Sequence, residues 1–190
     1  MQGTPVITNV SVNYTDRLNG SIFLAWTKPD PECGIDVVGY KVYYKSKLDM
    51  DLGVIGTRNS PEDTTFIHYP ELTMAGCYAV TAIDSFDNES AWSMPLICVD
   101  NCTYFEIPNV FTPNNDGYND ILRARTTDFV VRINMKIYSR SGSLVYETVD
   151  PYINWDGMYN GKYVAPGVYY YHCDVYENRI TGVETRHYWV

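Results

Sequence analysis

Short hydrophobic runs separated by turn-forming residues fill the first hundred positions of the chain. Within one such run, "CYAVTAI", Tyr78 and Val80 are expected to point to the face opposite Ala79. Successive side chains of a strand point to opposite faces, so this pattern predicts half-buried strands. The expected strands are residues 5–14, 21–26, 39–45, 52–58, 64–69, 77–83 and 91–98. Their number and spacing predict an antiparallel sandwich.

The second half continues the strand pattern with different turns. One expected strand has Val131, Ile133, Met135 and Ile137 alternating with polar residues, which predicts one wet face. The stretch "SRSG" is predicted to turn this strand into a hairpin with "SLVYETV", and "YNGK" predicts another hairpin because Asn and Gly both accept positive φ. The "APG" turn precedes a long Tyr-rich strand. A second sandwich is therefore expected.

Composition agrees with packed strands and excludes some partners. The chain has 45% hydrophobic residues, 15% aromatic residues and 18 tyrosines, and tyrosine suits a half-buried strand. A net charge of −9 repels phosphate backbones and anionic lipid, so no nucleic-acid partner is expected. No stretch approaches the roughly 20 apolar residues of a membrane helix, so no membrane insertion is expected.

The cysteines are Cys33, Cys77, Cys98, Cys102 and Cys173. An odd number with one CxxxC does not match a zinc pattern, so one or two disulfides and an oxidising compartment are expected. Cys98 could pair with Cys102, or Cys77 could pair with one of them, and the sequence leaves both open. Cys173 is predicted to be a buried free thiol.

The first half resembles a fibronectin type III domain over residues 4–99. The resemblance rests on Trp26, Tyr40, Tyr43, Leu72, Tyr78 and the closing "AIDSFDNESAWS". It implies that the Trp is a core residue and that the Tyr hydroxyl ties a tyrosine corner to the backbone. Such modules serve most often as spacers or supports, and the integrin-binding Arg-Gly-Asp of the family is absent.

The stretch "NVFTPNNDGYND" gathers Asn and Asp residues around a single Gly. It is typical of a tight turn, because Pro113 fixes φ, Gly117 supplies a conformation that other residues avoid, and Asn/Asp side chains cap nearby amides.

The same stretch also permits a calcium loop. Asn114, Asp116 and Asp120 fall at positions three, five and nine of a calcium-binding pattern. Thr112 replaces the first Asp of that pattern, and the final Glu is absent. Ca²⁺ would therefore need ligands from elsewhere, and otherwise no cofactor is expected.

Three motifs in the second half agree with one another: "IPNVFTPNNDGYNDIL", "MKIYSRSGSLVYET" and "WDGMYNGKYVAPGVYYY". In this order and spacing they resemble the gliding motility-associated C-terminal domain of Bacteroidota, the type B targeting domain of type IX secretion. The resemblance runs from about residue 104 to Val190, where such a domain is expected to end. Ser141 stands where the family often has Trp, and Met158 where it often has Lys.

The resemblance implies a non-enzymatic sorting signal. It would direct a large gliding adhesin through the periplasm and across the outer membrane to the cell surface. The implied partners are the type IX outer-membrane translocon and its accessory outer-membrane barrel proteins. Recognition is expected at the 112–120 loop, the 155–163 hairpin and the last strand, 183–190, whose edge could add a partner strand. The candidate residues are Pro113, Asn114, Asn115, Asp116, Gly117, Asn119, Asp120, Trp155, Asp156, Gly157, Asn160 and Gly161.

The predicted fold class is therefore all-β, with two antiparallel Ig-like or fibronectin III-like sandwiches in tandem. The first domain is expected at residues 4–99 and the sorting domain at residues 100–190. The joint "CVDNCTYFEIPN" has no Gly/Ser tract, so the two halves are expected to be held close together.

An enzyme is not expected. His68, His172 and His187 lie in strand-like runs, and the chain has no HExxH or GxSxG motif. Asp49 and Asp51 fall in a predicted loop, where solvated carboxylates are ordinary. The alternative function is a calcium-stabilised adhesive tandem that binds a ligand at the cell surface.

Overall fold

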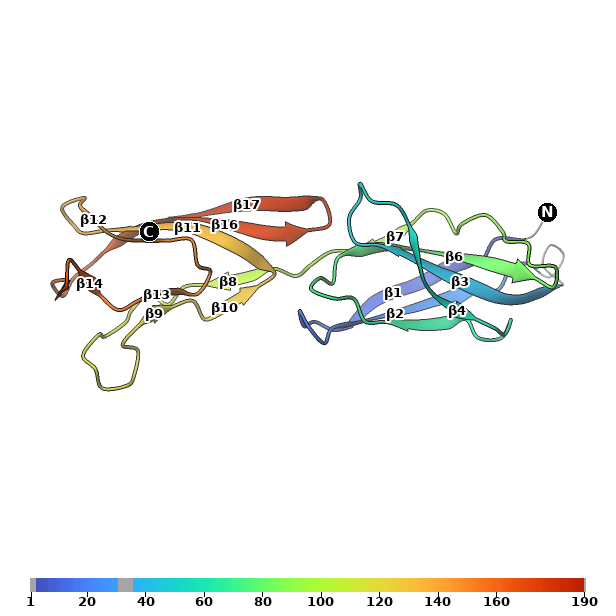
Figure 1. The fold of residues 1–190 in the computed structure, drawn as a ribbon, viewed down its shortest axis with the longest axis horizontal. Coiled ribbons are helices and arrows are strands. Elements are labelled where there is room, and N and C mark those ends of the chain that lie inside the picture. The colour runs from blue at the N-terminus through green and yellow to red at the C-terminus, as the bar shows by residue number, and fades with distance from the viewer. Residues whose placement is uncertain (1–2, 31–35, 190) are drawn as a thin grey trace. The chain divides into compact units, whose positions relative to one another are not determined.

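The structure is a computed structural model that describes residues 3–30 and 36–189 (Figure 1). Two compact units make up the chain: residues 1–101 with 179–182, and residues 102–178 with 183–190. The first unit contains β1 (Val6–Tyr14), β2 (Ser21–Thr27), β3 (Val37–Lys45), β4 (Gly53–Arg58), β5 (Thr65–His68), β6 (Gly76–Asp84) and β7 (Ile97–Val99). Across the described residues the elements are strands and no helix is long and apolar enough to span a membrane.

The first unit is the predicted antiparallel sandwich. Its sheets have the orders β1-β2-β5 and β4-β3-β6-β7. The buried core between them includes Leu24 and Trp26 of β2 and Val42 of β3. The Trp26 ring meets the Tyr40 ring edge to face, with centroids 5.4 Å apart, a favourable aromatic geometry. The core role expected for the Trp is therefore confirmed.

Strand β6 is buried on both faces, although its pattern predicted only one buried face. Its outer face is covered by a network around Glu89, whose carboxylate accepts hydrogen bonds from Thr81 at 2.7 Å and Lys41 at 2.8 Å. Tyr43 also donates to this carboxylate, and its ring lies 5.9 Å from Trp92. Polar and aromatic side chains from distant segments thus cover the outer face of β6, which the alternation of its own residues predicts to be exposed.

The strand expected at 91–98 is shorter, since β7 spans only Ile97–Val99. In the segment before β7, Ser90 and Ser93 hydrogen-bond to β6. Ser93 donates its amide to Val80 O at 3.0 Å and accepts the Val80 amide on its hydroxyl at 2.9 Å. Ser90 bonds Ala82 in the same two ways, each at 2.9 Å. Side-chain oxygens thus replace the main-chain carbonyls of a regular ladder, and Pro95 lacks an amide to continue one.

The prediction that the Tyr78 hydroxyl hydrogen-bonds to the backbone in a tyrosine corner is wrong. Tyr78 is buried, but its hydroxyl lies 2.9 Å from Nδ1 of His68. Burial lowers the pKa of His68 to about 4 and raises the pKa of Tyr78, so a neutral imidazole and a neutral hydroxyl share this hydrogen bond. The bond to the backbone comes from Tyr44, whose hydroxyl donates to Ala75 O at 2.7 Å.

The disulfide joins Cys77 of β6 to Cys98 of β7. The two residues are direct register partners with Cα atoms 4.0 Å apart. A Cys98–Cys102 bridge therefore does not form, and Cys102 is free and exposed. Cys173 is free and buried, as expected, and burial raises the pKa of its thiol to about 12. Cys33 lies outside the described residues.

The second unit is a four-stranded sheet covered by shorter ladders. The sheet has the order β12-β11-β16-β17. The two-stranded ladders β8–β10 and β9–β13 pack against it through the shared core. Its strands are β8 (Tyr104–Glu106), β9 (Leu122–Arg123), β10 (Thr126–Asp128), β11 (Val130–Tyr138), β12 (Leu144–Thr148), β13 (Ile153–Trp155), β14 (Met158–Tyr159), β15 (Lys162–Tyr163), β16 (Tyr170–Arg179) and β17 (Gly182–Trp189). One core joins both layers, with Phe105 and Trp155 packed in the same cluster as Met135 and Val175.

Most predicted turns of this unit are found, but the prediction that Val131 lies on the buried face of its strand is wrong. β14 and β15 pair across Asn160 and Gly161, which both have positive φ, 50° and 75°. Ile133, Met135 and Ile137 are buried as expected, whereas Val131 is 53% exposed. A register shift between Val130 and Arg132 explains this, because the extra residue of a bulge reverses the alternation.

Candidate recognition surface

An aromatic cluster around Trp155 lies at one side of the second unit. The Trp155 side chain is only 2% exposed, and its indole N–H donates to Met158 O at 3.1 Å. Tyr146 stacks on the indole with centroids 5.6 Å apart, Phe111 lies at 5.2 Å and Tyr169 at 5.8 Å. The tryptophan is therefore an anchor that holds three separate segments, rather than an exposed contact residue.

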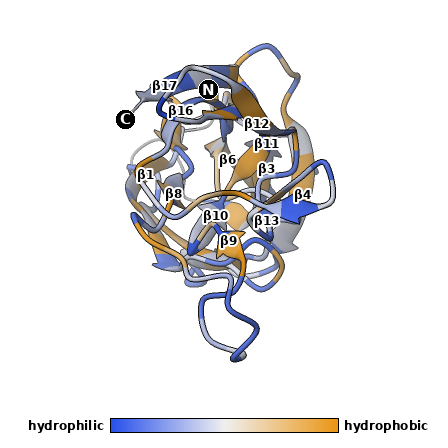
Figure 2. Cartoon of the chain, turned by 90° about the vertical axis from the view of Figure 1, so that its left-hand side faces the viewer, coloured by the Kyte–Doolittle hydropathy of each residue, from blue (hydrophilic) through white to orange (hydrophobic). Residues whose placement is uncertain are grey.

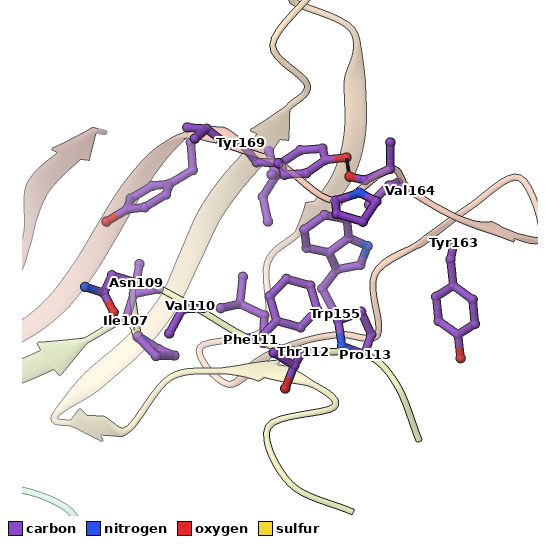
Figure 3. A pocket seen from close by; sticks show the side chains of 18 of the residues that line it. Ile107, Asn109, Val110, Phe111, Thr112, Pro113, Trp155, Tyr163, Val164 and Tyr169 are labelled. Atoms are coloured by element: carbon purple, nitrogen blue, oxygen red, sulfur yellow. Dashed lines mark hydrogen bonds between the residues drawn. The ribbon is translucent and has the colours of Figure 1, made fainter. Parts of the chain in front are cut away.

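An open apolar groove of about 850 Å³ lies beside this cluster (Figure 3). Two segments outside any strand, residues 107–113 and 164–169, supply most of its walls, and side chains from the neighbouring strands supply the rest. Val110 and Val168 on these walls are 66% and 64% exposed. Exposed apolar side chains that gather around a groove are typical of an interaction site.

The 112–120 loop carries the motif rich in Asn and Asp. It is the yellow-green loop below β9 in Figure 1, and it is hydrophilic in Figure 2. The Asp120 carboxylate accepts the amide of Asn114 at 3.0 Å, that of Asn115 at 2.6 Å and that of Gly117 at 2.7 Å. Asn115, Gly117 and Asn119 have positive φ, 62°, 87° and 53°. One carboxylate thus fixes a strained loop in the way that the turn interpretation predicts.

The carboxylate oxygens of this loop that could bind a metal ion already accept hydrogen bonds. The Asp116 carboxylate accepts from the Asn114 side chain at 2.9 Å and from the Tyr118 amide at 2.8 Å. These bonds hold the pKa of Asp116 below its ordinary value. Both oxygens of Asp120 also face amides, so as it stands the loop fits a Ca²⁺ shell of 6–8 oxygens poorly. A calcium site here stays a prediction.

We expect calcium to leave the stability of the chain unchanged. A ligand that binds only the folded state raises the melting temperature, and calorimetry of the metal-free protein with and without excess Ca²⁺ measures that shift. A clear rise that is lost in the Asp120→Asn variant, but kept in Asp128→Asn on β10, would show that the loop binds the ion.

Two of the expected recognition elements are in direct contact. Gly157 has φ 78°, and a side chain at this position would come within 2.8 Å of Pro113 Cγ. Asp156 accepts the Met158 amide at 2.9 Å and so shapes the turn into β14. Only glycine allows this approach, which links the 112–120 loop to the hairpin of β14 and β15.

The last strand lies apart from the groove lining. β17 is an edge strand that pairs with β16, and most of its residues are exposed. Val190, the final residue of the expected strand, is outside the described residues.

Several groove residues were not predicted. Phe111, Val164, Val168 and Tyr169 line the groove, and they lie in loops between the expected turns and strands. The available signal was local: "IPNVF" and "VAPGV" are uncharged and mostly apolar, although neither segment forms a strand. Uncharged apolar loops that are exposed favour a binding surface over a simple connection.

Comparisons with known proteins give one family match, which lies in the second half of the chain. Residues 105–190 match the family model described as CHU_C Type IX secretion signal domain. The chain is similar to the central fibronectin-III array of RIM-binding protein, with 13% identity, a TM-score of 0.39, and coverage of 98% of this chain and 68% of that one. It is similar to the FN1–FN3 domains of chicken CNTN1, with 13% identity, a TM-score of 0.39, and coverage of 100% and 65%. No curated protein matches the chain.

Proposed function

We propose that the second unit, which matches a type IX secretion signal domain over residues 105–190, is a sorting signal that exports the protein to which it belongs across the outer membrane to the cell surface. That match is the observation that carries the proposal. The wider protein would be a gliding adhesin of the cell surface, and the first unit would act as a spacer or support. The direct partners would be the outer-membrane translocon and its accessory proteins, met on the periplasmic side.

Recognition of the folded shape fits this unit better than catalysis does. The motif loop is held by its own hydrogen bonds, and the neighbouring groove is apolar. A partner could bury the exposed valines of the groove and read the polar loop beside it. Burial of apolar area supplies about 25 cal/mol per Å², and the fixed loop supplies specificity. Signal domains and fibronectin III-like domains are non-catalytic kinds of domain.

The proposal is tested by export of a reporter. A periplasmic enzyme fused to residues 1–190, or to residues 100–190 alone, is expected to reach the cell surface of a bacterium with a working type IX system. Protease accessibility of the reporter on intact cells measures this. The same fusions are expected to stay inside a strain that lacks the translocon. Retention of both fusions in the working strain would overturn the proposal.

A charge in the groove is expected to weaken export. Val168→Asp places a carboxylate on the groove wall, where a docked partner would bury it. Burying an unpaired charge costs at least about 1.4 kcal/mol, which is about tenfold in affinity. Val149→Asp is the matched control, because Val149 is 65% exposed, against 64% for Val168, and does not line the groove. Equal export of the two variants, each with an unchanged melting temperature, would exclude the groove as the docking surface.

A further inference from the structure

Two of the three histidines of the chain meet an aspartate on the outer face of the four-stranded sheet. Cys173 and Val175 of β16 are buried in the core, so the intervening Asp174 faces outward, and His172 lies on the same face. His187 of β17 completes the group, with Nδ1 2.6 Å from Asp174 Oδ1.

The three side chains present their ligand atoms to one small volume. His172 Nε2 lies 3.4 Å from Asp174 Oδ1, and all three ligand atoms lie within 4.8 Å of one another. The two imidazole rings are nearly parallel, at 27°, with centroids 6.4 Å apart. The His172 and His187 side chains are 51% and 55% exposed and Asp174 is 18% exposed, so an ion could enter from solvent.

We propose that His172, Asp174 and His187 form a surface site for Zn²⁺. Two imidazoles and one carboxylate are a common catalytic-type zinc set, with a water in the fourth position. Ligand atoms at tetrahedral Zn²⁺ lie about 3.4 Å apart, given bond lengths near 2.1 Å. The separation of His172 Nε2 from Asp174 Oδ1 already matches this edge. The contact between His187 Nδ1 and Asp174 Oδ1, now 2.6 Å, would open by about 0.8 Å, which rotation of the exposed imidazole allows.

The ligand types favour a transition metal such as Zn²⁺ over Ca²⁺ and Mg²⁺. Imidazole nitrogen is a borderline ligand that suits Zn²⁺, whereas Ca²⁺ and Mg²⁺ prefer oxygen alone. The site joins the edge strand β17 to its neighbour β16, so a bound ion would fasten the edge strand to the sheet. The simpler alternative is a solvated pair of histidines beside one carboxylate, which would contribute little to stability.

The test is a titration of the metal-free 190-residue chain with ZnCl₂, followed by calorimetry. Among the described residues Cys102 is the exposed free thiol, which could bind zinc by itself, so the Cys102→Ser background is used. We expect one equivalent to bind and the melting temperature to rise. His187→Gln and His172→Gln are each expected to lower the affinity at least about tenfold, since loss of a supporting group alone costs 10–100-fold. Co²⁺ is expected to give the visible bands of a tetrahedral site only when both histidines are present.

Asp128→Asn on β10 is the control, since it removes an acidic side chain from the second unit and leaves the three ligands in place. It is expected to bind zinc as the background protein does. If the background protein binds no stoichiometric zinc, or if both histidine variants bind it equally well, the site does not exist. Export of the reporter fusion is read separately, so failure of the zinc site leaves the sorting proposal unaffected.

Discussion

Trp155→Ala is expected to destabilise the second unit by about 4 kcal/mol, the usual cost of removing a large buried aromatic side chain. The indole is almost fully buried and contacts Phe111, Tyr146 and Tyr169. Its loss would leave a cavity at the point where β13 meets the groove walls. Equilibrium urea unfolding followed by circular dichroism measures the change, and export of the reporter fusion is expected to fall with it.

The chain supplies a control of the same residue type. Trp189 of β17 is 71% exposed, so Trp189→Ala is expected to change the free energy of unfolding by at most about 0.5 kcal/mol. Trp155→Phe keeps most of the apolar volume and is expected to lie between the two. Similar unfolding curves for Trp155→Ala and Trp189→Ala would show that Trp155 does not anchor the unit.

Loss of the disulfide is expected to destabilise the first unit by about 3 kcal/mol. Cys77 and Cys98 are 21 positions apart, and a cross-link of this length restricts the unfolded chain by roughly that amount. Changing both residues to Ala removes the bridge without leaving a reactive thiol. The measurement is the urea midpoint of this double variant against the oxidised protein.

Cys102→Ala is the control, which tests whether replacing a cysteine outside the bridge also destabilises the protein. Cys102 is exposed and unbridged, so this variant is expected to unfold at the same urea concentration as the original protein. A double variant as stable as the oxidised chain would mean that the bridge contributes nothing to the folded state.

The strands could be predicted where one face is buried and the other wet. β11 follows this rule from Ile133 onward, and the alternation of Ile133, Met135 and Ile137 gave its buried face correctly. The rule fails for β6, since both of its faces are covered, the outer one by Glu89 and Trp92 from a later segment. The bulge beside Val131 likewise depends on the pairing with β16, which local alternation does not contain.

The polar turn of the candidate site was predictable, and the apolar groove was not. Pro113, Gly117 and Asp120 carry turn chemistry that can be recognised from residue types alone. The groove depends on two loops, 107–113 and 164–169, that are far apart in sequence and have no regular period. The approach of His187 to Asp174 depends in the same way on the pairing of β16 with β17.

Asn101 lies two residues beyond the expected end of the first domain, yet its side chain stabilises that domain. Its side chain is buried, and Oδ1 accepts the amides of Met74 at 2.7 Å and Ala75 at 3.1 Å. A fragment cloned to end at residue 99 would leave both amides without this acceptor, at about 1–3 kcal/mol for each group left buried. Anyone who expresses the first unit alone would do better to carry the coding sequence through residue 101.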